Sequence, residues 1–92
     1  MPRKSLAEEL YEDEEDCVDE DGHWIVVYDF EGKPNPRFWV NLRRLSTLGA
    51  GSRLLQFSVY MTGSRRIARV AVLLARHYGA SVEVFRAEQV NP

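Results

Sequence analysis

The chain has 92 residues, 45% of them hydrophobic and 28% charged, which leaves room for one globular domain rather than two. No apolar run is long enough to cross a bilayer, and the charged N-terminus lacks the apolar core of a signal peptide, so we predict a cytoplasmic protein with no membrane partner. A single cysteine, Cys17, excludes an intramolecular disulfide and a cysteine-rich zinc site.

The net charge of −2 combines two segments of opposite sign. Residues 1–21 carry ten acids and two bases, whereas residues 22–92 carry ten bases and four acids, which gives −8 and +6. A basic, arginine-rich body is typical of proteins that bind phosphate or nucleic acid, although a merely solvated surface has the same composition. We predict an acidic, largely disordered N-terminal extension over residues 1–21 and a folded domain over residues 22–92.

Within the extension, a short helix is an alternative to disorder. Ser5 and Glu8 have the spacing of a capping box, and Leu6 and Leu10 fall on one helical face. These residues favour a helix over about residues 6–15 that docks on another surface.

The segment from His23 to Phe30 predicts the first strand of the folded domain. Alternation directs Trp24, Val26, Tyr28 and Phe30 to one face and Ile25, Val27 and Asp29 to the other. Since both faces are apolar for most of their length, we expect a central strand covered on both sides. Asp29 stands out, because a carboxylate at the end of an apolar strand is costly unless it is paired, hydrogen-bonded or bound to a cation.

The rest of the chain predicts two helices and three more strands. Asn35 and Pro36 are typical of a helix start, and a helix follows over about residues 37–48. Residues 53–62 change phase in the middle, which predicts either two strands joined by a very tight turn or one bulged strand. Ser64 caps a second helix over about residues 65–78, and a last strand covers about residues 81–87.

This order predicts an α+β, ferredoxin-like βαββαβ fold, with an antiparallel four-stranded sheet and two helices on one face. Two helices cover only one face, yet the first strand is apolar on both, and a body of roughly 70 residues is marginal as a lone core. We therefore expect the open sheet face to meet a second copy of the chain in a homodimer. Coverage of that face by the acidic extension is the competing account.

The arginines of the two helices are candidates for contact with nucleic acid. On the first helix, Phe38, Leu42 and Leu45 form the expected buried stripe, while Arg37, Asn41 and Arg44 lie on another side. On the second helix, Arg65, Arg69 and Arg76 align within about 40°. With Arg43 and Arg66, these arginines predict bidentate phosphate binding, and since no aromatic residues alternate with them we expect no base stacking. Pairing of the arginines with the acidic extension is the alternative.

The residues together resemble the small CRISPR-associated adaptation proteins, the second of the two near-universal Cas families. The similarity lies in the segment Ile25-Val26-Val27-Tyr28-Asp29-Phe30, an arginine-bearing helix after it, and then Arg53, Gln56 and Ser58-Val59-Tyr60. An arginine-rich second helix and an apolar last strand complete a resemblance that covers residues 23–90.

The resemblance implies a ferredoxin-like homodimer in complex with the CRISPR integrase, which inserts foreign DNA into the repeat array, and we add Arg53 to the nucleic-acid-binding candidates. Some members are described as endonucleases of RNA or DNA in which aspartates of two subunits hold magnesium, and the matching catalytic and metal-binding residue is Asp29. Within one chain we expect no second acid beside it, because Glu31 lies in a loop and Glu83 and Glu88 come late.

Four functions stay open at this point. The chain is either a mainly architectural CRISPR adaptation subunit, a magnesium-dependent endonuclease that uses Asp29, a toxin-like ribonuclease of the virulence-associated protein D type, or a regulatory or scaffold domain without a nucleic-acid role. Capping of backbone amides in the next loop is the structural alternative for Asp29. The acidic extension also suggests regulation, because as a mimic of nucleic acid it would compete for the basic face, so deletion of residues 1–21 is expected to tighten DNA binding.

Overall fold

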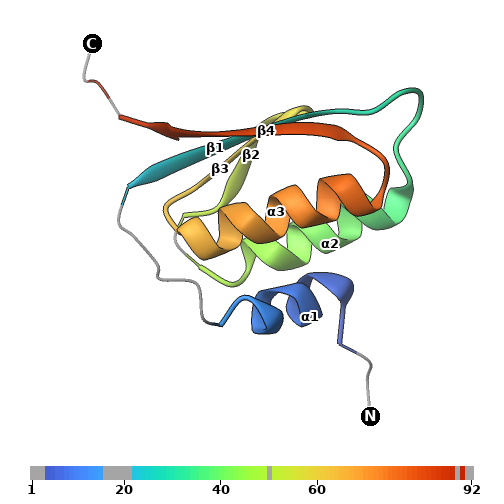
Figure 1. Ribbon diagram of the computed structural model, residues 1–92, viewed down its shortest axis with the longest axis horizontal. Helices are drawn as coiled ribbons and strands as arrows, with labels where there is room; N and C mark the ends of the chain where they lie inside the picture. Colours follow the sequence, from blue (N-terminus) through green and yellow to red (C-terminus); the bar gives the residue numbers. More distant parts are fainter. Residues whose placement is uncertain (1–3, 16–21, 50, 89, 91–92) are drawn as a thin grey trace.

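A computed structural model describes residues 4–15, 22–49, 51–88 and 90 (Figure 1). Its elements are α1 (Leu6–Asp13), β1 (His23–Asp29), α2 (Pro36–Ser46), β2 (Arg53–Gln56), β3 (Val59–Thr62), α3 (Arg65–His77) and β4 (Ser81–Ala87). From β1 onward the order is the predicted β-α-β-β-α-β. The α+β class and the antiparallel four-stranded sheet are confirmed and are consistent with a ferredoxin-like fold.

The strand order in the sheet is β2-β3-β1-β4, so β1 is an inner strand and β2 and β4 are the edges. β1 pairs antiparallel with both neighbours, and Val26 lies between Tyr60 of β3 and Val84 of β4. This register fixes which side chains share a face of the sheet, because alternate residues of each strand point the same way.

The segment over residues 53–62 forms a hairpin. β2 and β3 pair antiparallel, and only Phe57 and Ser58 separate them, with a register shift between Leu54 and Gln56. The predicted very tight turn is therefore confirmed. The register shift shows that β2 also carries a bulge or similar irregularity, which was the alternative prediction.

Helices α2 and α3 cover one face of the sheet (Figure 1). Both start at the predicted caps, since the side chain of Asn35 accepts a hydrogen bond from Arg37 N and that of Ser64 accepts one from Ile67 N. These caps satisfy backbone donors that a helix start leaves without partners. The largest buried side chains of the core are Val26, Tyr28, Phe38, Leu42, Leu45, Tyr60, Ile67, Val70 and Leu74.

Helix α1 lies on the outer side of α2 and α3, away from the sheet (Figure 1). Ala7 is fully buried there, and Leu6 and Leu10 pack against the core. Ser5 caps α1 by accepting a hydrogen bond from Glu8 N, as the capping-box spacing predicts. The helical alternative is thus the correct one for residues 6–13, where disorder was the main expectation. Residues 16–21 lie outside the described residues, and the domain boundary at residue 22 stays a prediction.

No helix covers the other face of the sheet within the described ranges (Figure 1). On this open face Ile25, Val27, Val59 and Met61 are partly exposed, and Phe85 is 52% exposed. Within one chain β1 is therefore covered on one side only, and the described part of the acidic extension lies against the helices instead of this face. Among the described residues, no helix has the length and apolar character needed to span a membrane.

Candidate functional site

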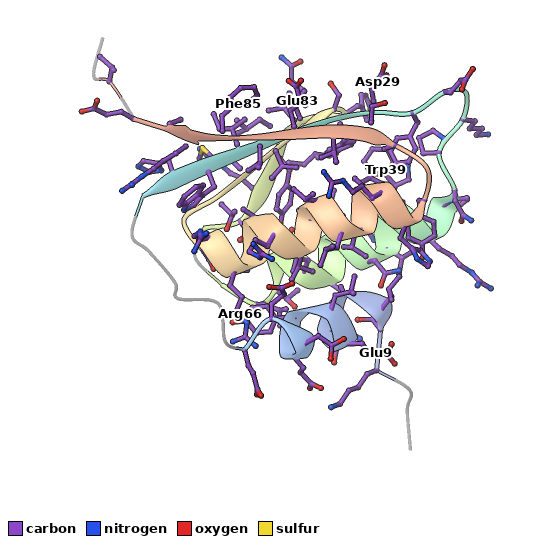
Figure 2. All side chains as sticks on the ribbon, in the orientation of Figure 1. Glu9, Asp29, Trp39, Arg66, Glu83 and Phe85 are labelled. Carbon is purple, nitrogen blue, oxygen red and sulfur yellow. The ribbon has the colours of Figure 1, made fainter. Side chains whose placement is uncertain are left out.

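Asp29 is the last residue of β1, and its side chain is exposed on the open face of the sheet (Figure 2). The preceding residue, Tyr28, points the opposite way into the core and is 3% exposed. The alternation expected for this strand is therefore confirmed. It places a carboxylate at the end of an apolar surface, opposite Ser81 of β4.

A second carboxylate lies on the same face. Glu83 of β4 stands opposite Val27, two residues before Asp29, so the two acids are diagonal neighbours whose α-carbons lie about 7–8 Å apart. Figure 2 shows both side chains, with Phe85, on the side of the sheet away from the helices. The expectation that no acid of the same chain accompanies Asp29 is wrong. The alternation of Val82 and Val84 with Glu83 places Glu83 on one face of β4, but its proximity to Asp29 follows only from the pairing of β4 with β1.

This pair can supply part of a cation site. The described residues contain no group of three or more His, Cys, Asp or Glu side chains that could hold a metal ion. One chain therefore offers Asp29 and Glu83, which are hard oxygen donors of the type that Mg²⁺ prefers, and a complete site needs water or a second chain.

Three of the arginines predicted to bind nucleic acid contact the N-terminal segment that contains α1. Arg66 donates from Nε to the carbonyl oxygen of Tyr11 at 2.9 Å, and its guanidinium lies 3.8 Å from the centre of the Tyr11 ring (Figure 2). Arg69 pairs with Glu14 at 2.9 Å, and Arg44 pairs with Glu8 at 3.2 Å; those three arginine partners all belong to residues 8–14. These contacts show that arginines of α2 and α3 pair with the acidic extension, which was the alternative to nucleic-acid binding in the sequence analysis.

Asn41 anchors the same contact. Its Oδ1 accepts a hydrogen bond from Ala7 N at 3.0 Å, and its Nδ2 donates to the carbonyl oxygen of Arg37 at 2.8 Å and to Tyr78 Oη at 3.3 Å. Asn41 is only 8% exposed, so the side of α2 that it shares with Arg37 is buried at this position, which the sequence did not predict. The reason is that α1 adds a second buried side to α2, which the periodicity of α2 alone does not reveal.

The remaining arginines are spread over several surfaces. Arg65 and Arg76 line a groove between α3 and β4 together with Arg69, which agrees with the predicted alignment of these three. Arg43 lines a second groove with Trp39 and Phe57 at the β2 edge. Arg53 lies opposite Met61 and so belongs to the open face, and Arg37 is exposed at the start of α2.

Trp24 lines the α3–β4 groove but is not among the predicted site residues. Its neighbour on β4, Arg86, lies directly opposite it, with the guanidinium 5.7 Å from the indole centre. Trp24 comes from β1 and the other groove residues come from α3 and β4, so no spacing along the chain indicates their proximity. No aromatic residue alternates with these arginines along the helix, as expected, but Trp24 of β1 lies beside them in the folded chain. The expectation of no base stacking therefore overlooked an aromatic ring.

Tyr28 and Tyr60 pack in the core. Tyr60 is fully buried and its hydroxyl lies 2.9 Å from Ser46 Oγ, whereas no hydrogen-bond partner of Tyr28 Oη is present among the described residues. Burial raises the pKa of both phenols. They are therefore neutral packing groups at physiological pH.

Comparison with known proteins adds no family to this picture. No protein-family model matches the chain, and no curated protein and no solved structure is significantly similar to it.

Proposed function

We propose that the chain is a mainly architectural, homodimeric subunit of CRISPR adaptation, which holds the DNA backbone beside the CRISPR integrase in the cytoplasm. The observation that supports this function is the open sheet face, where an apolar centre adjoins two carboxylates and the helical side carries arginines. An exposed apolar surface with a polar rim is typical of a protein–protein interface. A second copy of the chain is the partner that this proposal assigns to it.

A two-fold axis parallel to the strands suits this face. The sheet centre lies between β3 and β1, so such an axis stacks β1 of one subunit over β3 of its partner. Neighbouring strands are about 4.8 Å apart and packed sheets about 10 Å apart, and the axis keeps both Asp29 residues at the same end. Their side chains then point toward one another across the interface. An axis across the strands would instead place them at opposite ends.

The same axis pairs opposite charges at the edges of the face. It lays β2 of one subunit over β4 of its partner, because these strands are the two edges of the sheet. Arg53 of β2 and Glu83 of β4 are both exposed and both on the open face. The register puts Arg53 level with Phe85, so each edge of the dimer brings a guanidinium within two residues of a carboxylate along the strand, which favours this arrangement over one that joins like charges.

The test combines solution mass and duplex binding on the full chain. We expect a mass of twice the 10.6 kDa chain, binding to a duplex of arbitrary sequence that weakens steeply with salt, and co-elution with the integrase encoded beside the same repeat array. A folded monomer that binds no duplex at low salt would leave the scaffold domain as the better account.

A magnesium-dependent endonuclease of RNA or DNA is the second candidate, and Glu83 beside Asp29 favours it. The proposed axis would bring the two Asp29 carboxylates toward one another, each with Glu83 of its own chain as a diagonal neighbour, and these oxygens would hold a hydrated Mg²⁺ that polarises a phosphate and lowers the pKa of a bound water. Asp29→Asn and Glu83→Gln should each abolish magnesium-dependent cleavage while nucleic-acid binding persists. Cleavage that is absent from the unaltered protein, or unchanged in both variants, rejects the nuclease and leaves the architectural role.

A further inference from the structure

The groove between α3 and β4 is apolar at its floor and basic at its rim. It has a volume of ≈ 360 Å³, and the residues that line it are Trp24, Arg65, Ala68, Arg69, Val72, Leu73, Arg76 and Val84. Val84 faces the covered side of the sheet, yet it is 46% exposed, because α3 presents Ala68 and Val72 there and these side chains do not fill the space above the edge strand. Val84 is thus an apolar side chain of the groove that this chain leaves exposed, beside Ala68 and Val72, which belong to or pack against the core.

The basic rim follows the axis of α3. Arg65 and Arg69 are separated by a rise of about 6 Å, and Arg76 lies about 10 Å further along the helix. Arg76 is exposed and Arg69 is paired with Glu14, so the rim already holds one carboxylate. A ligand with several negative charges in a row fits this rim better than a single anion does.

An aromatic ring lies among these cations. Trp24 is partly buried at one end of the groove, opposite Arg86, and its indole Nε1 has no hydrogen-bond partner among the described residues. Grooves that combine a cationic rim with an aromatic platform are typical of single-strand binding, where the rim follows the backbone and bases stack on the rings. A duplex does not use such a platform, because its bases are stacked on one another.

We propose that the α3–β4 groove binds a single-stranded segment of nucleic acid, with its phosphates on Arg69 and Arg76 and one base against Trp24. This inference deepens the proposed function and rests on it. It assigns duplex DNA to a surface that contacts the phosphate backbone and an unpaired strand to the groove.

The test uses tryptophan fluorescence of the full chain. The sequence has two tryptophans, so Trp39→Phe leaves Trp24 as the only emitter. In this background we titrate an oligothymidylate of about eight nucleotides, within the usual site size of single-strand binding folds, and then a blunt-ended duplex and inorganic phosphate. We expect the oligothymidylate to quench Trp24, and the duplex and phosphate to leave its emission unchanged.

Matched variants separate the groove from general charge attraction. Arg76→Gln should weaken oligothymidylate binding about tenfold and reduce its salt slope by about 0.7, as for the loss of one phosphate contact. Lys33→Gln removes the same charge from an exposed loop position outside the groove and should change neither quantity by a comparable amount. Both positions are exposed, so neither variant is expected to impair folding.

The outcomes distinguish the groove from the proposed function. Salt-dependent binding that leaves Trp24 emission unchanged and is equally weakened by both variants overturns the groove but keeps backbone binding. Equal quenching by duplex or by phosphate overturns the single-strand assignment. Absence of binding to oligothymidylate and duplex alike overturns both proposals.

Discussion

The two faces of the sheet carry similar residues and differ in what covers them. On the covered face Val26 and Tyr60 are fully buried under α2 and α3, and α1 lies outside those helices as a further layer. On the open face Val27 and Val59, their neighbours in sequence, are partly exposed and no described helix lies over them. The chain therefore completes its core on one side and leaves an apolar surface on the other.

This difference shows that an apolar pattern on both sides of a strand does not specify what buries each side. The covered face is buried by helices of the same chain, whereas no described element lies over the open face, which is why we propose a partner for it. Charge follows the same division, because the acids of α1 lie against the arginines of the helices, while Arg53, Asp29 and Glu83 border the open face.

A carboxylate on the covered face is expected to have the largest effect. Val26→Asp places a charge at a fully buried position of β1 without a partner, which costs several kcal/mol and exceeds what a small domain can lose. We expect the variant to lose its cooperative unfolding transition, as followed by circular dichroism against temperature. A folded Val26→Asp variant with the original midpoint would mean that this face is less tightly packed than its burial indicates.

Alkaline pH tests the burial of the covered face without any substitution in it. Burial raises the pKa of Tyr28 and Tyr60 above the usual 10.0, so above pH 10 the unfolded chain releases phenol protons that the folded chain keeps. Stability is then unaffected below pH 10 and falls as the pH rises further, by up to about 1.4 kcal/mol per pH unit for each tyrosine. Urea unfolding between about pH 9 and pH 12 measures this slope.

Tyr28→Phe is the control for the alkaline effect. The hydroxyl of Tyr28 has no hydrogen-bond partner among the described residues, so its removal leaves no other group unsatisfied. The variant should retain its neutral-pH stability and lose about half of the alkaline slope. An unaltered slope would assign the alkaline loss of stability to other groups.

The same substitution one residue further along β1 should have a different result. Val27→Asp places its charge on the open face, where a monomer can solvate it, so the fold should persist. The dimer should dissociate, with a loss of affinity of about a hundredfold or more, because two such charges would meet at the apolar centre of the interface. Light scattering after size-exclusion chromatography gives the mass. A Val27→Asp variant that stays dimeric places the interface elsewhere.

Reversal of the edge charges sharpens the orientation of the dimer. If β2 lies over β4 of the partner, Arg53→Glu brings like charges together at both edges and should weaken the dimer about tenfold. Glu83→Arg should do the same, and the double variant should recover most of the loss, which is the coupling expected of residues in contact. Additive losses in the double variant, measured by sedimentation equilibrium, would exclude the axis parallel to the strands.

The fold was largely predictable because its signals are local. The caps at Asn35 and Ser64, the alternation of β1 and β4 and the stripes of α2 and α3 each depend on a few consecutive residues, and all of them agree. The hairpin over residues 53–62 followed from the change of phase alone.

The parts of the candidate site that escaped the sequence depend on long-range pairing. Glu83 approaches Asp29 only because β4 pairs with β1, and Trp24 joins the arginines of α3 only because that helix lies over the sheet edge. Asn41 is buried by α1, a segment whose acidic composition favoured disorder. In each case two distant segments must be placed together before the contact has any signature in the sequence.

The smallest expected effect concerns the acids of α1. Glu8→Gln with Glu14→Gln removes the partners of Arg44 and Arg69, and because these ion pairs are partly exposed, the loss of stability should stay at about 1 kcal/mol or less. Ala7 and Asn41 still hold α1 in place, so the arginines become available to phosphate while the fold is retained. Duplex binding should tighten a few-fold, and its salt slope should steepen by about 0.9 for each phosphate gained.

Glu9→Gln with Glu15→Gln is the matched control for these acids. Both carboxylates are exposed and make no ion pair among the residues that the structure describes, yet their loss changes the net charge by the same amount. If the two double variants tighten DNA binding equally, overall charge governs the effect. If only the Glu8 and Glu14 variant tightens DNA binding, these two acids act by occupying the guanidinium groups of Arg44 and Arg69. The N-terminal segment then competes with DNA for the arginines of the helices.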